Sequence, residues 1–137
     1  MATLKKMPPI FRSCCKGLAL ASHLESTAGF LFGLAGDPIY IKDACFSSSK
    51  ATDRALAHEI AHNFSSEYWS FYPEILQEWK AKFWVNGTPK TTPPTEYGAT
   101  NYSEDFAESV AEFFCNGKEL KNSDPERYNF ILKKVWK

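Results

Sequence analysis

The sequence HEIAH, at residues 58–62, contains two of the three histidines in this chain of 137 residues. Positions i and i+4 of an α-helix lie on the same face, so on a helix His58 and His62 can bind one metal ion together. Glu59 would then lie beside the ion, where its carboxylate can take a proton from the water molecule that the metal activates. The pattern is typical of zinc-dependent peptidases and predicts such a site, provided that these residues are helical and a third ligand exists.

The residues around the motif predict a helix from about Ala51 to Ser65. The preceding run Ser47–Ser49 supplies several candidate N-caps. Leu56, Ile60 and Phe64 are spaced by four and form a hydrophobic stripe on a different face from the two histidines. We therefore expect the stripe to enter the core while the histidines remain available to a metal ion.

Hydrophobic periodicity and turn residues predict further elements on both sides of this helix. We expect an extended lead-in over residues 1–12 and a single domain over residues 13–137. Pro38–Ile41 is short, β-branched and aromatic, which predicts a strand, and Phe30–Leu34 is expected to pair with it. The expected helices are Cys14–Thr27, Tyr72–Trp84, Ser103–Asn116 with Ser103 as its N-cap and Gly117 at its end, and one that Asp124-Pro125 opens. The predicted class is α+β, mostly helical, with a small β-sheet or edge strand beside the helix that carries HEIAH.

The third metal ligand must come from a distant part of the chain. A catalytic zinc ion normally has three protein ligands and a water molecule. Residues 63–67 contain neither the glycine nor the further histidine that one class of zinc peptidases has after HExxH. Downstream, Glu104, Glu108 and Glu112 are spaced by four and line one face of a predicted helix. Glu104, in the first turn, is the strongest candidate, although acids at this spacing more often form a solvated face.

Composition limits the classes of protein to which the chain can belong. The 16 basic and 16 acidic residues give a formal net charge of 0, and no basic stripe stands out, so we expect no nucleic-acid partner. No apolar run reaches membrane-spanning length, so we expect no membrane partner. The stretch Gly17–Gly36 is too short and too polar at its apolar core for a signal peptide. A monomer is expected, either cytoplasmic or secreted or translocated as an effector by a non-classical route.

The four cysteines do not have the paired CxxC spacing of a structural zinc site. Without a convincing signal peptide, reduced thiols are the expectation, because disulfides are rare in the cytosol. A single long-range disulfide, such as one from Cys45 to Cys115, is the alternative.

The stretch YGATNYSEDFAE, at residues 97–108, resembles the second signature of the anthrax lethal factor catalytic domain and its relatives, which include the Pro-Pro endopeptidases. In that family HExxH is followed by a tyrosine-glycine pair and then by E-x-F-A-E on a helix. The separation between HExxH and the first glutamate of E-x-F-A-E is similar here, where residues 63–103 lie between His62 and Glu104. The resemblance covers about residues 38–136, including PERYNFI at residues 125–131, which is similar to the family's closing helix. It implies a compact zincin-like metallopeptidase domain of the gluzincin type.

The resemblance also implies a role for each matching residue. His58, His62 and Glu104 would bind one catalytic Zn²⁺ ion. Glu59 would be the general base, and Tyr97 would donate a hydrogen bond to the developing oxyanion.

Glu108 would lie behind the ligands and orient a ligand histidine through its free ring N–H. Two positions depart from the family's pattern: Ala99 stands where a polar residue is frequent, and Asp105 replaces an aromatic or small residue. Neither is expected to be a ligand, so the departures bear on specificity more than on chemistry.

The expected function is a zinc-dependent endopeptidase that hydrolyses peptide bonds with a zinc-activated water molecule and a glutamate base. Its expected partner is a peptide or protein substrate. One alternative is a toxin or effector protease domain that acts on a host or competitor protein by the same chemistry. Another is a catalytically inactive zinc-binding interaction domain, although the presence of both Glu59 and Tyr97 argues against it.

Overall fold

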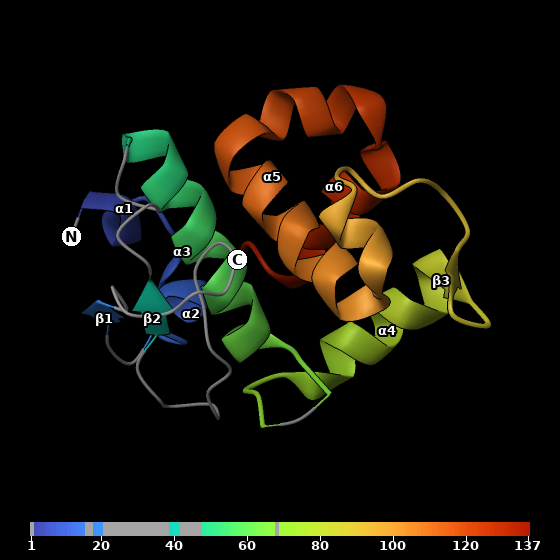
Figure 1. Cartoon of the computed structure of the whole chain (residues 1–137), viewed down its shortest axis with the longest axis horizontal. Coiled ribbons are helices and arrows are strands. Elements are labelled where there is room, and N and C mark those ends of the chain that lie inside the picture. The colour runs from blue at the N-terminus through green and yellow to red at the C-terminus, as the bar shows by residue number, and fades with distance from the viewer. Residues whose placement is uncertain (1, 16–17, 21–38, 42–47, 68) are drawn as a thin grey trace.

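The computed structural model describes residues 2–15, 18–20, 39–41, 48–67 and 69–137. Within these ranges the chain is mostly helical, with two small two-stranded sheets, as the predicted α+β class requires (Figure 1). The described helices are α1 (Ala2–Lys5), α2 (Pro9–Arg12), α3 (Ser49–Phe64), α4 (Pro73–Phe83), α5 (Tyr102–Ser123), α6 (Pro125–Lys134) and the short 3-10 helix η2 (Tyr97–Thr100). The described strands are β1 (Leu18–Leu20), β2 (Ile39–Ile41), β3 (Trp84–Val85) and β4 (Thr88–Pro89). No helix in the described ranges is long and apolar enough to cross a membrane.

Helix α3 carries HEIAH, and its boundaries follow from its caps. Ser48 is extended, and its hydroxyl accepts a hydrogen bond from the Ala51 N–H at 3.0 Å. Ser48 is thus the N-cap, which confirms the prediction that a serine of the run 47–49 caps this helix. At the other end, Ser65 leaves the helical conformation. Its hydroxyl donates to the Tyr72 carbonyl at 2.6 Å and accepts from the Leu76 N–H at 2.7 Å. Ser65 therefore ends α3 and also ties it to the start of α4.

The predicted stripe of α3 lies in the core. Leu56 and Ile60 are fully buried, and Phe64 is only 2% exposed. Burying each of these side chains contributes roughly 1.5–3 kcal/mol to folding. Helix α3 packs beside α5, and α5 also contacts η2, α4 and α6 (Figure 1). The pairing of α3 with α5 brings the two halves of the predicted site together.

Helix α5 differs from its prediction at both ends. Asn101, rather than Ser103, is the N-cap, and its side-chain oxygen accepts from the Glu104 N–H at 2.9 Å. The helix also continues beyond Gly117, because that glycine does not adopt the positive φ with which a glycine ends a helix. The predicted end is instead a kink at Asn116, where φ is −138° and ψ is 45°. The carboxylate of Glu112, one turn earlier, accepts from the Asn116 side chain at 2.7 Å.

The extended lead-in expected over residues 1–12 is wrong. The described part of this segment forms α1 and α2, and Pro9 stands in the first turn of α2, where a proline needs no N–H partner. Phe11 is fully buried, with its ring 5.8 Å from that of Phe64 and 5.3 Å from that of Trp136. The segment is thus part of the core, and Pro8-Pro9 starts a helix.

The strand predicted at Pro38–Ile41 is confirmed over Ile39–Ile41, where β2 pairs in parallel with β1 and contacts α3, and Pro38 lies outside the described residues. The helix expected over Cys14–Thr27 is wrong at residues 18–20, which form β1, because their backbone pairs with β2. The rest of that expected helix beyond Leu20 lies outside the described residues. So do the strand expected at Phe30–Leu34 and the Cys45 end of the alternative disulfide.

Candidate metal centre

Three predicted ligands converge between α3 and α5. His58 and His62 lie one turn apart on α3, and Glu104 lies in the first turn of α5. The two Nε2 atoms are 3.1 Å apart. Oε2 of Glu104 lies 3.2 Å from Nε2 of His58 and 3.3 Å from Nε2 of His62. These three side chains form a group that can hold a metal ion.

The spacing of the donor atoms fits a tetrahedral ion. With ligand distances of about 2.0–2.1 Å, two donors of a tetrahedral zinc site lie roughly 3.3–3.4 Å from each other. The three observed separations, 3.1 to 3.3 Å, are close to this value. Two imidazole nitrogens and one carboxylate oxygen are also a donor set found in catalytic zinc sites.

A carboxylate lies at each ring nitrogen of His58, Glu108 at Nδ1 and Glu104 at Nε2. Its Nδ1 lies 2.7 Å from a carboxylate oxygen of Glu108, which can only accept when ionised, so Nδ1 carries the proton. In neutral His58 the Nε2 is then a bare lone pair that faces the Glu104 carboxylate. Burial opposes the charged form most strongly, yet hydrogen bonds to Glu104 and Glu108 outweigh it and raise the pKa of His58 to about 10. The two carboxylates therefore favour a positive charge at this ring, which either a proton or a metal ion on Nε2 would supply.

The other two ligands respond to the same charges. Burial and the nearby His58 lower the pKa of His62, because two imidazoles at this distance cannot both be protonated. For Glu104, burial favours the neutral acid, but hydrogen bonds to both histidines prevail and lower its pKa to about 2. Glu104 is thus an ionised oxygen donor at neutral pH.

Glu59, the predicted base, is buried beside the ligands. It is 6% exposed, and its Oε1 lies 4.0 Å from Nε2 of His58. Burial raises its pKa to about 8, although the charge of His58 acts in the opposite direction. A carboxylate whose pKa lies near neutrality can both take up and release a proton in this range.

Tyr97 opens η2 and lies over the centre. Its ring stacks on that of His58 with 6.0 Å between centroids, and the side chain is 50% exposed. Burial and the negative charge of Glu104 raise the pKa of the phenol, so it remains a hydrogen-bond donor at neutral pH. Because η2 packs against α5, it brings Tyr97 to the metal group.

The acidic face of α5 is occupied by partners rather than by solvent. Glu108 accepts from His58, and Glu112 accepts from Arg54 at 2.7 Å. Burial opposes ionisation of Glu108, but the bond to His58 and the charges of His58 and Arg54 outweigh it and lower its pKa. The contact expected between Glu108 and a ligand histidine is present, and its role in a metal site stays a prediction.

Asp105 is the main feature that the sequence did not predict. In the sequence it is noted only as a departure that bears on specificity, whereas the side chain is fully buried and forms an ion pair with Arg127 at 2.8 Å. It also accepts from the indole N–H groups of Trp79 at 3.2 Å and Trp84 at 2.7 Å. Since Asp105 follows Glu104 directly, this network fixes the first turn of α5 against α4 and α6. The arginine within PERYNFI was the available signal, because a buried arginine needs an acidic partner.

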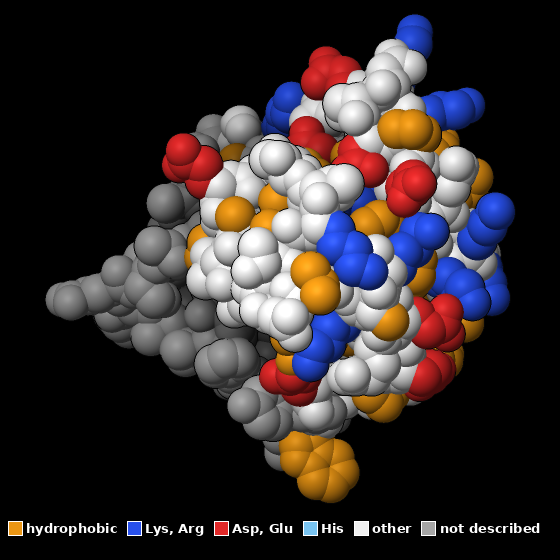
Figure 2. Space-filling view, turned by 90° about the vertical axis from the view of Figure 1, so that its right-hand side faces the viewer, with side chains coloured by type: hydrophobic (Ala, Val, Ile, Leu, Met, Phe, Trp, Pro, Cys, Tyr) orange, Lys and Arg blue, Asp and Glu red, His pale blue; other side chains and the backbone are white. Residues whose placement is uncertain are grey.

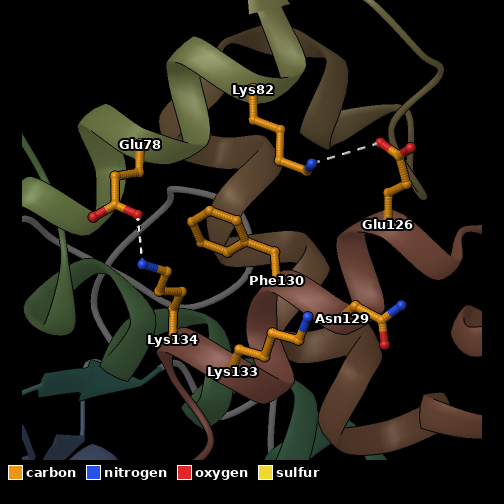
Figure 3. A pocket seen from close by; sticks show the side chains of 7 residues that line it. All are labelled: Glu78, Lys82, Glu126, Asn129, Phe130, Lys133 and Lys134. Atoms are coloured by element: carbon orange, nitrogen blue, oxygen red, sulfur yellow. Dashed lines mark ion pairs between the residues drawn. The ribbon is translucent and has the colours of Figure 1, made fainter.

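A hollow between α4 and α6 lies away from the candidate centre. A depression of about 450 Å³ separates α4 from α6, and two ion pairs, Lys82–Glu126 at 3.9 Å and Lys134–Glu78 at 2.9 Å, bind its walls together (Figure 3). None of the candidate site residues lines it. The face of the molecule in Figure 2 carries acidic and basic side chains interspersed, without one sign prevailing.

No protein-family model, curated protein or solved structure matches this chain. Its class therefore rests on its own fold and site: a mostly helical α+β chain with a group of side chains able to hold a metal ion between two packed helices.

Proposed function

We propose that this chain is a zinc-dependent endopeptidase of a zincin-like, lethal-factor-like type. The observation that carries the proposal is the convergence of His58, His62 and Glu104 within 3.1 to 3.3 Å of one another. A group able to hold a metal does not by itself make a peptidase. The further support is that a buried carboxylate, Glu59, and a phenol, Tyr97, lie at the same centre.

The donor set favours zinc over harder cations. Mg²⁺ and Ca²⁺ prefer oxygen ligands and higher coordination numbers, whereas two imidazoles with one carboxylate suit Zn²⁺. A carboxylate that accepts from the far nitrogen of a ligand histidine is the usual support of a zinc site, and Glu108 makes that contact with His58. Bound there, zinc would supply a Lewis acid and lower the pKa of a water molecule to about 7.

The residues of the chain have separate tasks in the proposed hydrolysis. Glu59 accepts the proton of the attacking water and then passes it to the leaving amine. Tyr97 donates a hydrogen bond from its hydroxyl to the oxygen of the scissile carbonyl, where negative charge develops in the transition state. The Tyr97 side chain is half exposed, so a substrate can contact it.

The experiment is a cleavage assay on a peptide library with the zinc-loaded chain, comparing wild type with Glu59→Gln. We expect the wild type to cleave a subset of peptides and the variant to be slower by about 10²–10⁴-fold, because it lacks the base. Zinc content, measured by mass spectrometry, should be equal in the two proteins. Equal cleavage rates would assign the base to another group. A wild type that carries zinc and cleaves nothing would favour the inactive binding domain.

A further inference from the structure

Thr95 makes two hydrogen bonds between parts of the site that are far apart in the sequence. Its hydroxyl donates to Oε1 of Glu108 at 2.9 Å. The same oxygen accepts from the backbone N–H of Gly98 at 3.0 Å. One bond reaches α5 and the other reaches η2, so a single hydroxyl joins the two elements.

The direction of both bonds is fixed by their partners. A backbone N–H can only donate and an ionised carboxylate can only accept, so the hydroxyl proton must point to Glu108. Oε1 of Glu108 also accepts from the partly exposed side chain of Arg54, at a longer distance of 3.5 Å. Of the two hydrogen bonds that Oε1 of Glu108 accepts from these side chains, the one from Thr95 is the shorter.

Both hydrogen-bond partners of Thr95 are directly connected to residues of the candidate centre, Glu108 to His58 and Gly98 to Tyr97. The second oxygen of Glu108 holds Nδ1 of His58 at 2.7 Å, which sets the orientation of that ring. Gly98 follows Tyr97 directly, and the ring of Tyr97 stacks on His58. The path from Thr95 thus reaches His58 from both sides.

Gly98 makes this close approach sterically feasible. A Cβ at this position would lie 3.3 Å from Oγ1 of Thr95, 3.3 Å from Cβ of Pro93 and 3.4 Å from Cα of Asp105. These separations are tighter than ordinary contacts, so a side chain here would press η2 away from its neighbours. The small residue therefore lets η2 approach the hydroxyl of Thr95.

We propose that Thr95 is a positioning residue that holds Tyr97 and His58 in register through its bonds to Gly98 and Glu108. The inference rests on the proposed function, since it concerns the geometry of that metal centre. Its consequence is that the oxyanion donor and one metal ligand are not set independently: loss of one hydroxyl loosens both.

The test compares Thr95→Val, which keeps the shape and removes both bonds, with Thr95→Ser, which keeps the hydroxyl. Thr92→Val is the matched control, because Thr92 is an exposed threonine in the same connection. Three quantities are measured for the full chain: amide hydrogen exchange at Gly98, zinc affinity by competition with a chelator, and kcat and KM on a peptide that the wild type cleaves.

We expect Thr95→Val to exchange the Gly98 amide at least about 10-fold faster and to bind zinc about 10-fold more weakly, the low end of the range for outer partners of a metal ligand. The kcat should fall about 10-fold or more while KM changes little. Thr95→Ser should recover all three quantities to within about 3-fold, which a role limited to packing would not produce.

A double-mutant cycle with Glu108→Gln keeps the test decisive if Thr95→Val lowers overall stability. If Thr95 acts on zinc through Glu108, Thr95→Val should cost much less zinc affinity in the Glu108→Gln background than alone. Additive losses, or wild-type zinc affinity and Gly98 exchange in Thr95→Val, would overturn the inference. Wild-type protein that binds zinc but cleaves no peptide would contradict the endopeptidase instead, and the zinc and exchange measurements would still decide the role of Thr95.

Discussion

His58 has both ring nitrogens engaged, and this limits the states that the ring can adopt. Nδ1 is bound to Glu108 and Nε2 faces Glu104 and His62, at 2.7, 3.2 and 3.1 Å respectively. Turning the ring over would break the bond to Glu108 and direct a carbon atom at the other ligands. The orientation that metal binding needs is therefore set before any ion is bound, and binding exchanges the proton on Nε2 for the ion.

The Tyr97 hydroxyl has a role that can be separated from the fold. The side chain is half exposed, and its ring rather than its hydroxyl makes the contact with His58. Tyr97→Phe should keep the stack and lower kcat by about 10²–10³-fold, the usual cost of losing one oxyanion donor, with zinc affinity unchanged. Steady-state kinetics on the wild-type substrate measures this. Tyr128→Phe, on α6, is the control, and an unchanged kcat in Tyr97→Phe would remove the hydroxyl from the mechanism.

At the scale of elements, the centre depends on how α5 is held. Trp79 of α4 contacts the rings of Phe106 on α5 and Phe130 on α6, at 5.4 and 5.1 Å. The same indole donates to Asp105, whose carboxylate pairs with Arg127 from α6. Asp105 makes the ionic contacts and Phe106 makes the aromatic one, and the two residues directly follow Glu104 on α5. Both kinds of contact therefore fix the turn from which Glu104 reaches the histidines.

Removing one partner of this buried pair should be costly. Arg127→Met leaves the carboxylate of Asp105 buried with indole and hydroxyl donors but no cation, so we expect a loss of about 3–5 kcal/mol in the free energy of unfolding. Urea denaturation measures this. The exposed pair of Lys134 and Glu78 is the control, because Lys134→Met should cost at most about 1 kcal/mol. A loss below about 1 kcal/mol for Arg127→Met would show that the pair is not a main support of α5.

Local geometry explains why part of the site could be predicted from the sequence. The i, i+4 spacing of His58 and His62 fixes their common face once α3 is helical, and the same holds for the acids of α5. Thr95 gave no such signal, because its role exists only where η2 packs on α5. The burial of Phe11 likewise depends on Phe64 and on Trp136 near the other end of the chain. Contacts of this kind follow from tertiary packing, which a local pattern does not encode.

In the molecule as a whole, the candidate centre joins two helices that are distant in the sequence. The ligands on α3 and α5 are separated by residues 63–103, which include α4 and both strands of the β3–β4 sheet. An ion bound there would cross-link α3 to α5 in the folded state alone. It would therefore stabilise the fold by mass action, and a structural and a catalytic role would coincide in one site.

The most direct measurement of the central claim is the X-ray absorption spectrum of the chain loaded with zinc. We predict one zinc ion per chain and about four nitrogen and oxygen neighbours at about 2.0–2.2 Å, with the outer scattering of two imidazole rings. Replacing His58 and His62 with alanine together should abolish that imidazole signal. A spectrum dominated by sulfur at about 2.3 Å, or a chain that binds no zinc, would contradict the claim that His58, His62 and Glu104 form a zinc site.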